Sequence, residues 1–197
     1  MSFAESIAAE EIELLEYADF DGPIVVVKEI DEDYAEAIEY LSKQKILGFD
    51  TESKPTFKSG EPRNGVALLQ LSGADRAYLF RPKYVGLPKS VADILANGNI
   101  IKVGAAVHDD IKGLQKYRKF VPKGFVDLQK ISESHGIMDK SVRKLAAIVL
   151  GLRVSKSQQL SNWEASQLSG AQLKYAAIDA WVCREIYIRF ERLKIEN

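Results

Sequence analysis

The stretch ILGFDTE, residues 46–52, decides how the rest of the chain is interpreted. Its first half is an apolar run typical of a buried strand, and its second half carries Asp50 and Glu52. Side chains two residues apart on a strand point to the same face of the sheet. We therefore expect these two carboxylates to project together from the end of a buried strand.

Two further stretches carry acids at positions that a metal site would use. VGAAVHDDI, residues 103–111, ends with the adjacent Asp109 and Asp110 in an expected helix. YAAIDAW begins at Tyr175 in a helical pattern, where Tyr175 and Asp179 share a face at positions i and i+4. Each stretch alone is a weak signal, because acids at strand ends and on helix faces are usually solvated. Together, carboxylates from a strand and two helices can surround hard divalent cations.

The residue types in this set suit a two-metal phosphodiester hydrolase. Two magnesium or manganese ions roughly 4 Å apart stabilise the attacking and leaving oxygens of a phosphoryl displacement. Asp50 is the predicted bridging ligand, because it lies on a rigid strand beside Glu52. Glu52 and Asp179 would complete the first metal, and Asp110 would support the second, directly or through water. Tyr175 would hold the attacking water or deprotonate it. Because a free tyrosine has a pKa of about 10, orientation assisted by the metal is the favoured role.

Length and composition exclude several other classes of protein. The 197 residues allow one domain with a full core, and 46% apolar and 28% charged residues are ordinary for a soluble globular chain. No apolar run approaches the roughly 18 residues of a membrane span, and the acidic N-terminus does not resemble a signal peptide. The single cysteine, Cys183, excludes an internal disulfide, and we expect a buried structural thiol. These features predict a cytoplasmic protein without a membrane partner.

Charge is distributed unevenly along the chain. Residues 1–33 contain eleven acids and one base, Lys28, so they carry −10 of a total net charge of −1 and leave +9 for the remainder. Neutralising the four predicted metal ligands would raise that value to +13. A basic body around an acidic focus suits a polyanion that is cut at a metal site. The alternative is that the charges are scattered over solvated faces.

Strand and helix patterns alternate along the chain after its first 20 residues, which are either an appended helix or a frayed tail. The expected strands are residues 24–27, 46–50, 66–71, 76–80, 100–103 and 125–128, with the third and fourth forming a hairpin. The expected helices are residues 31–42, residues 88–96, one beginning near 106 and a long last helix to about 193. Ser169 and Gln172 predict a capping box that starts the last helix. The order indicates an α/β domain with a mixed sheet and a long, functional loop over residues 53–65.

These motifs resemble the DEDD superfamily of 3′–5′ exonucleases, in the tyrosine-bearing branch that includes ribonuclease D and the exonuclease domain of the Werner syndrome helicase. GFDTE is similar to the first motif of this family. The stretch from Gly104 to Leu114 is similar to the second motif, and this alignment selects Asp110 over Asp109. Tyr175 begins the third motif, a Y-x-x-x-D. The resemblance covers roughly residues 24–193.

The resemblance implies an α/β ribonuclease H-like fold with a mixed five-stranded sheet flanked by helices. It also implies two Mg²⁺ or Mn²⁺ ions and the release of nucleoside 5′-monophosphates from the 3′ end of DNA or RNA. The implied catalytic residues are Asp50, Glu52, Asp110, Tyr175 and Asp179. We expect an acidic N-terminal extension over residues 1–22 and the exonuclease domain over residues 23–197. A Ser166-Gln167 pair stands where ribonuclease D often has Arg-Pro, so the resemblance does not extend to its substrate.

Four residues are predicted to contact nucleic acid. Lys156, Arg153 and Lys144 lie near the last motif and could bind phosphates, with a solvated basic face as the alternative. Phe57, in the long loop, is a candidate for stacking on a base. Two other functions remain open: a catalytically silent nucleic-acid-binding domain on the same fold, and a ribonuclease H-like endonuclease. The sequence does not set the oligomeric state or the preference for DNA or RNA.

Overall fold

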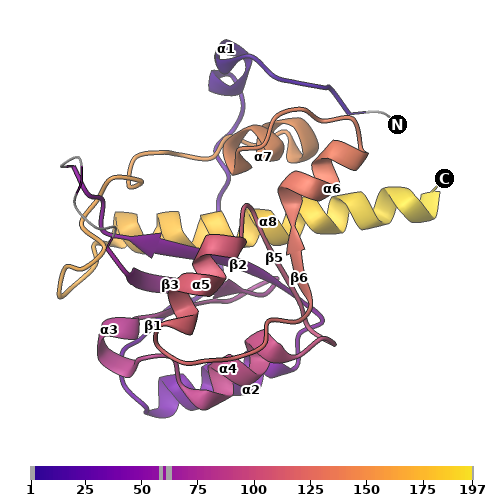
Figure 1. The fold of residues 1–197 in the computed structure, drawn as a ribbon. Coiled ribbons are helices and arrows are strands. Elements are labelled where there is room, and N and C mark those ends of the chain that lie inside the picture. The colour runs from indigo at the N-terminus through magenta and orange to yellow at the C-terminus, as the bar shows by residue number, and fades with distance from the viewer. Residues whose placement is uncertain (1–2, 58–59, 61–63, 197) are drawn as a thin grey trace.

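Strand β2 occupies the centre of a six-stranded mixed sheet, in the order β1-β4-β3-β2-β5-β6 (Figure 1). The computed structural model describes residues 3–57, 60 and 64–196. The strands are β1 (Ile24–Val27), β2 (Ile46–Ser53), β3 (Val66–Ser72), β4 (Ala77–Phe80), β5 (Ile101–Gly104) and β6 (Phe125–Asp127). The helices are α1 (Ala9–Glu13), α2 (Glu32–Ser42), α3 (Pro82–Val85), α4 (Lys89–Ala96), α5 (His108–Gln115), α6 (Leu128–Ser134), α7 (Val142–Leu150) and α8 (Gly170–Glu196).

Pairing within the sheet confirms the predicted hairpin and the mixed topology. β3 is antiparallel to both β2 and β4, whereas β5 is parallel to β2 and β6 is parallel to β5. The sheet has six strands rather than the five that the family resemblance implied. The additional edge strand is β1, whose β-branched run pairs in parallel with β4, from Ile24 opposite Ala77 to Val27 opposite Phe80.

Helices cover both faces of the sheet, and the side chains of β2 alternate between them. Leu47 and Phe49 are buried in the cluster that contains α2, α4 and part of α5. Gly48 points the other way, toward α8, which crosses the opposite face in Figure 1. Burying a leucine or phenylalanine side chain contributes roughly 1.5–3 kcal/mol, so this alternation fixes which face each later residue of β2 must take.

Helix α8 lies unusually close to β2 because Gly48 has no side chain. A Cβ atom added at Gly48 would lie 2.6 Å from the carbonyl carbon of Ala180, and its oxygen would be closer still. The backbone of α8 is therefore in direct contact with the central strand. This contact fixes the height of the helix above the sheet at the level of Asp179.

The predicted start of α8 is confirmed. Ser169 and Gln172 form a reciprocal capping box: the Ser169 backbone donates to Gln172 Oε1 at 2.9 Å, and the Gln172 backbone donates to Ser169 Oγ at 3.2 Å. The helix then runs for 27 residues, about 40 Å at 1.5 Å per residue. Tyr175 and Asp179 consequently lie one and two turns inside a helix whose first turn is anchored.

The N-terminal segment, residues 3–20, lies along the body rather than fraying from it. Helix α1 has only five residues, but Ile12 and Phe20 are buried. Arg153 exchanges backbone hydrogen bonds of 2.8 Å with Glu16 and Ala18. In Figure 1 this segment lies above α7. The division of the chain at residue 22 remains a prediction.

Three large or reactive side chains of the C-terminal half lie in the core. Cys183 is buried, as expected for a structural thiol, Trp163 is also buried, and Trp181 packs at 6.0 Å between ring centroids against Phe20. Part of the long loop predicted over residues 53–65, namely 58–59 and 61–63, lies outside the described residues. Among the helices that are described, none combines the length and apolar character of a membrane span.

Candidate active site

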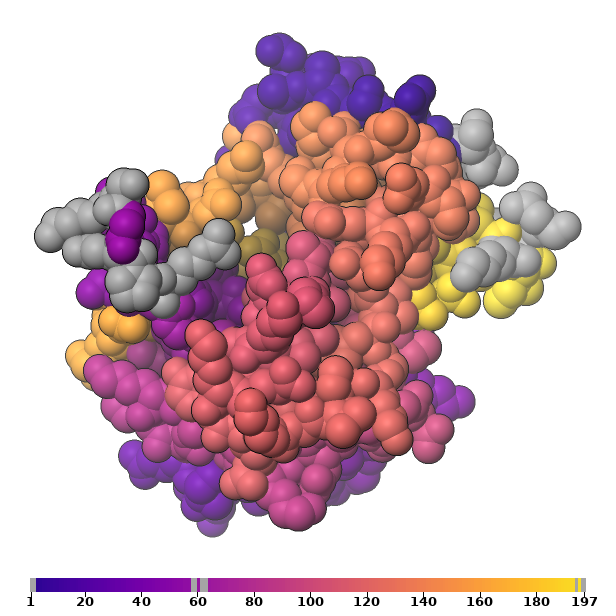
Figure 2. All heavy atoms as spheres, in the orientation of Figure 1, coloured from indigo at the N-terminus to yellow at the C-terminus, as the bar shows by residue number. Residues whose placement is uncertain are grey.

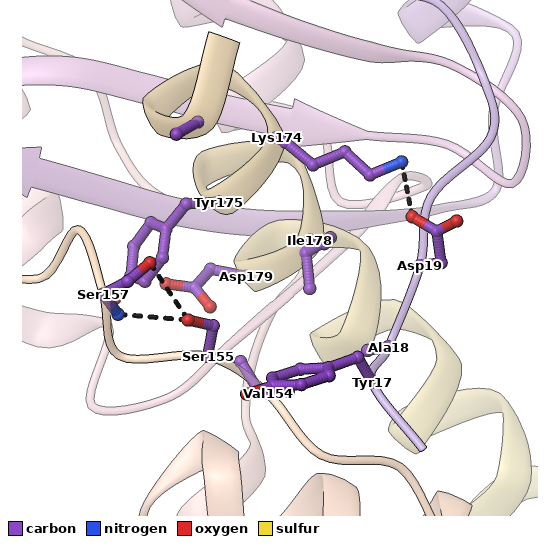
Figure 3. Close-up of a pocket in the computed structure, with 11 residues that line it drawn as sticks. Tyr17, Ala18, Asp19, Val154, Ser155, Ser157, Lys174, Tyr175, Ile178 and Asp179 are labelled. Carbon is purple, nitrogen blue, oxygen red and sulfur yellow. Dashed lines mark hydrogen bonds and ion pairs between the residues drawn. The ribbon is translucent and has the colours of Figure 1, made fainter. Parts of the chain in front are cut away.

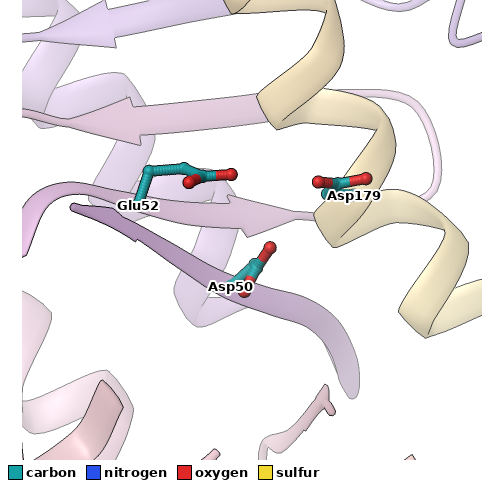
Figure 4. Close-up of side chains that lie close together, drawn as sticks. All are labelled: Asp50, Glu52 and Asp179. Carbon is teal, nitrogen blue, oxygen red and sulfur yellow. The ribbon is translucent and has the colours of Figure 1, made fainter. Parts of the chain in front are cut away.

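Three carboxylates from two elements converge at the end of β2. Asp50, Glu52 and Asp179 each place an oxygen so that all three oxygens lie within 4.8 Å of one another (Figure 4). Asp50 and Glu52 share the face of β2 that carries Gly48, and this face is covered by α8. The strand alternation and the close approach of the helix thus bring together acids that are 129 positions apart in the sequence.

The fourth predicted acid, Asp110, lies on α5 beside the end of β2. Thr51, between the two strand acids, points toward α5, and its hydroxyl donates a short hydrogen bond to Asp110 Oδ1. Asp110 therefore lies beside the three-carboxylate cluster rather than within it. Asp109 is exposed, so the structure brings Asp110 and not its neighbour toward the site.

The turn that leads into α5 is held by a side chain from β6. Strand β5 pairs with β2 only from Ile46 to Gly48. The chain then turns toward α5 beside the remainder of β2, which does not pair with β5. Ala106 adopts a positive φ of 54° in this turn. Its backbone donates to Asp127 Oδ1 at 3.0 Å, and the same oxygen also accepts from Gln129 at the start of α6. Asp127 thereby fixes the position from which α5 presents Asp110.

Crowding makes it costly for all of these acids to be ionised without a cation. Burial, together with the charges of Asp179 and Asp110, raises the pKa of Asp50 well above its ordinary range. Burial and the charge of Asp50 raise the pKa of Glu52 to about 9, and burial raises the pKa of Asp179 to about 7. Hard divalent cations prefer oxygen ligands and would offset this repulsion. The donor set therefore fits a divalent metal site.

Tyr175 lies one helical turn before Asp179 and packs against the core. Its ring lies 5.9 Å from that of the buried Trp163, measured between centroids. Burial and the charges of Asp179 and Glu52 raise the pKa of the Tyr175 hydroxyl well above its ordinary value. The hydroxyl therefore stays protonated at neutral pH, which suits a role in hydrogen bonding to water or substrate rather than as a base.

The site opens to solvent beside α8. In the space-filling view a hollow lies between α5, the segment that follows α7 and the end of β2 (Figure 2). A cavity of about 230 Å³ reaches Tyr175 and Asp179 from the side of the N-terminal segment and is also lined by Tyr17, Ser155 and Lys174, among others (Figure 3). Tyr175 and Asp179 are thus accessible to a ligand along α8.

The residues predicted to contact nucleic acid differ in their surroundings. Lys156 is exposed and forms no ion pair within the described part of the chain, and Phe57 is 78% exposed. Arg153 is paired with Glu13, and Lys144 Nζ is paired with Asp139 Oδ1 at 2.8 Å. The structure brings none of the four into the carboxylate cluster, and their role in binding remains a prediction.

Sequence reasoning missed two polar residues at the site. Thr51 holds Asp110 through its hydroxyl. Because Thr51 lies between Asp50 and Glu52 on a strand, its side chain points away from the face that carries them, and this alternation could have indicated a separate role for Thr51. Gln70 pairs in register with Asp50 and is buried, and neither polar atom of its side chain has a hydrogen-bond partner among the residues described. An amide within the apolar run VALLQLS was the available signal for Gln70.

Comparison with known proteins agrees with this geometry. A family model described as 3′–5′ exonuclease matches residues 25–194, nearly the whole chain. The chain belongs to the 3′–5′ exonuclease family. The match contains β2, α5 and α8, and hence every member of the predicted catalytic set.

Individual relatives support the assignment. The chain is 29% identical over 177 residues to the exonuclease mut-7 homolog of Aedes aegypti, covering 77% of this chain and 24% of that protein. It is 34% identical over 147 residues to exonuclease 3′-5′ domain-containing protein 2 of Drosophila melanogaster, covering 73% and 25%. The crystal structure of the Aedes aegypti Nibbler EXO domain has the same fold, with a TM-score of 0.78, 24% identity, and 92% and 93% of the two chains covered.

The chain spans about a quarter of the length of these two protein relatives. The match therefore covers a part of each relative and not the whole of it. The solved EXO domain, in contrast, matches over nearly its full length, which supports the ribonuclease H-like fold class expected from the sequence.

Proposed function

We propose that this protein is a 3′–5′ exonuclease that hydrolyses phosphodiester bonds of DNA or RNA and releases nucleoside 5′-monophosphates. The observation that carries the proposal is the cluster of Asp50, Glu52 and Asp179, whose oxygens lie within 4.8 Å of one another on the elements that the family match includes. The proposed cofactors are two Mg²⁺ or Mn²⁺ ions, and the proposed location is the cytoplasm.

Each side chain has a distinct proposed task. Asp50, Glu52 and Asp179 would hold one of the two ions, and Asp50 and Asp110 would hold the other, Asp110 directly or through water. When bound, the ions supply charge stabilisation for the attacking and leaving oxygens of the displaced phosphate. Thr51 keeps Asp110 in place through its hydroxyl.

Tyr175 acts on the water rather than on the metal. Its hydroxyl donates a hydrogen bond that orients the attacking water toward the phosphorus atom, because its raised pKa keeps it protonated and so unavailable as a base at neutral pH. The position of Tyr175 on α8, one turn before Asp179, couples the orientation of water to the metal ligand on the same rigid element. Lys156 and Phe57, both exposed, are the proposed contacts for phosphate and base.

The decisive experiment follows cleavage of labelled single strands. Purified protein is incubated with oligonucleotides labelled at the 5′ or the 3′ end, with Mg²⁺, with Mn²⁺ or with a chelator. The proposal expects metal-dependent shortening from the 3′ end and nucleoside 5′-monophosphates as the product. The Asp50→Asn variant, which keeps the shape of the side chain, should lose this activity. Shortening only from the 5′ end, or undiminished activity in chelator, would refute the proposal.

The same experiment separates the two other functions. A silent nucleic-acid-binding domain would retain the labelled strand without shortening it in either metal. A ribonuclease H-like endonuclease would cut a circular single strand, whereas an exonuclease requires an end. Matched DNA and RNA substrates in the same series determine the preferred sugar, because a 2′-hydroxyl is read by local contacts.

A further inference from the structure

Two arginines near the candidate active site share a single carboxylate from the N-terminal segment. Arg143 Nη2 on α7 donates to Glu13 Oε1 at 2.6 Å, and Arg153 forms an ion pair with Glu13 Oε2. Arg153 Nη1 also donates to the backbone carbonyl of Glu13 at 3.2 Å. One carboxylate on α1 therefore bridges two guanidinium groups that belong to a distant part of the sequence.

This arrangement has a surplus of positive charge. Lys156 lines the same cavity of about 210 Å³, together with Glu13 and the two arginines. Three cations thus face one carboxylate. The Nε atom of Arg143 is also buried and has no hydrogen-bond partner among the described residues. The ion pair with Glu13 therefore leaves one N–H donor of Arg143 unused. Arginine pairs bind phosphate in the same planar, two-oxygen manner in which they bind a carboxylate.

The arginine cavity shares lining residues with the cavity beside the candidate active site. Tyr17, Val154 and Ser155 line both this cavity and the one that reaches Tyr175 and Asp179 (Figure 3). A strand whose 3′ end lies at the carboxylates can therefore extend past these three residues to the arginines. That direction leads from the cleaved nucleotide toward its 5′ neighbours.

We propose that Arg143, Arg153 and Lys156 form a binding site for a backbone phosphate on the 5′ side of the cleaved nucleotide. In the protein without a strand, the carboxylate of Glu13 occupies this site as a substitute anion. The proposal rests on the exonuclease function proposed above, because it needs a strand that leads away from the acids. The acidic N-terminal segment then competes with nucleic acid for the arginines, and a bound strand displaces Glu13.

The competition predicts a specific effect of salt on binding. Neutralising a phosphate of a single strand by a protein cation contributes about −0.7 to the slope of log binding constant against log salt concentration. In the wild type, Glu13 already neutralises the arginines, so this contribution is reduced. Removing the charge of Glu13 should restore it.

The test compares two variants with the same change of charge on the same helix. Glu13→Gln removes the bridging carboxylate, whereas Glu10→Gln removes a carboxylate of α1 that forms no ion pair within the described ranges. Binding of a 5′-fluorescein-labelled thymidine dodecamer is measured by anisotropy in chelator, over a series of salt concentrations. We expect Glu13→Gln to bind about three- to tenfold more tightly at low salt and to steepen the slope by about 0.7, with Glu10→Gln close to wild type.

A third variant keeps the test decisive if Glu13→Gln unfolds. Arg143→Gln should weaken binding of the strand and flatten the salt slope. If Arg143 only docked α1 onto the body, the same variant would change the thermal midpoint of unfolding and leave binding unaltered. Equal affinities and slopes for Glu13→Gln and Glu10→Gln, or an unchanged slope for Arg143→Gln, would overturn the proposal. Because binding is measured in chelator, these outcomes are independent of cleavage and are distinguishable from a failure of the exonuclease function itself.

Discussion

Replacing Gly48 by alanine tests whether packing at the centre of the sheet sets the geometry of the carboxylate cluster. The added Cβ would lie 2.6 Å from the carbonyl carbon of Ala180, whereas ordinary contact begins at 3.4 Å. Helix α8 must therefore move away from β2 by about 0.8 Å or more. Asp179 is adjacent to Ala180, so it would be carried away from Asp50 and Glu52.

The expected losses follow from that displacement. A misplacement of about 1 Å in a catalytic arrangement can lower the rate roughly 100-fold. Overpacking of a core typically destabilises a protein by about 1–3 kcal/mol, which corresponds to roughly 2–12 °C in the thermal midpoint for a chain of this size. Gly48→Ala should therefore reduce nuclease activity about 100-fold and weaken Mn²⁺ binding while the protein remains folded.

Three measurements on the same sample test this reasoning. Circular dichroism follows unfolding, electron paramagnetic resonance counts unbound Mn²⁺, and a labelled oligonucleotide reports cleavage. Gly98→Ala is the matched control, because its added Cβ would meet only the Lys123 side chain, at an ordinary 3.7 Å. If Gly48→Ala retained the Mn²⁺ affinity and rate of wild type, the contact between α8 and β2 would not determine the site geometry.

Three further predictions concern single groups of the site. Thr51→Val removes the hydroxyl that holds Asp110 and should lower the rate tenfold or more, whereas Thr51→Ser should retain most of it. In metal-free protein the raised pKa values of Glu52, about 9, and of Asp179, about 7, mean that the folded state binds more protons than the unfolded chain above about pH 4. The stability of the folded protein should therefore fall as pH rises toward 9. Glu52→Gln should unfold at a higher temperature than wild type at pH 8 but not at pH 5. The same difference in thermal midpoint between variant and wild type at both pH values would contradict the assigned burial of Glu52. Tyr175→Phe should lower kcat at least 100-fold with Mn²⁺ affinity unchanged, and weaker Mn²⁺ binding would instead assign the hydroxyl to the metal.

Local patterns predicted those parts of the fold that depend on neighbouring residues. Alternation in β2 placed Asp50 and Glu52 on one face, and the capping box at Ser169 located the start of α8. These signals are reliable because periodicity and capping act within a few residues. The convergence of the strand acids with Asp179 was predicted from the metal chemistry of carboxylates and from the family resemblance, since no local rule joins positions so far apart.

Contacts between distant segments were not predictable in this way. The sequence predicted phosphate contacts, or a solvated basic face, at Arg153 and Lys144, but it could not show that Glu13 and Asp139 pair with them. The residue pattern indicated a strand at 24–27, but the family resemblance implied a five-stranded sheet, and neither could show that this strand pairs with β4. Both depend on tertiary packing that residue spacing does not encode.

Helix α8 supplies Asp179 and Tyr175 and is also the last element of the described chain. During synthesis, Asp50 and Glu52 emerge more than a hundred residues before their partner acid. A partly made chain, or one cut before residue 175, therefore lacks the third carboxylate of the cluster and the tyrosine beside it. The carboxylate cluster is complete only after α8 has packed across β2, so the proposed nuclease activity depends on the docking of this one helix.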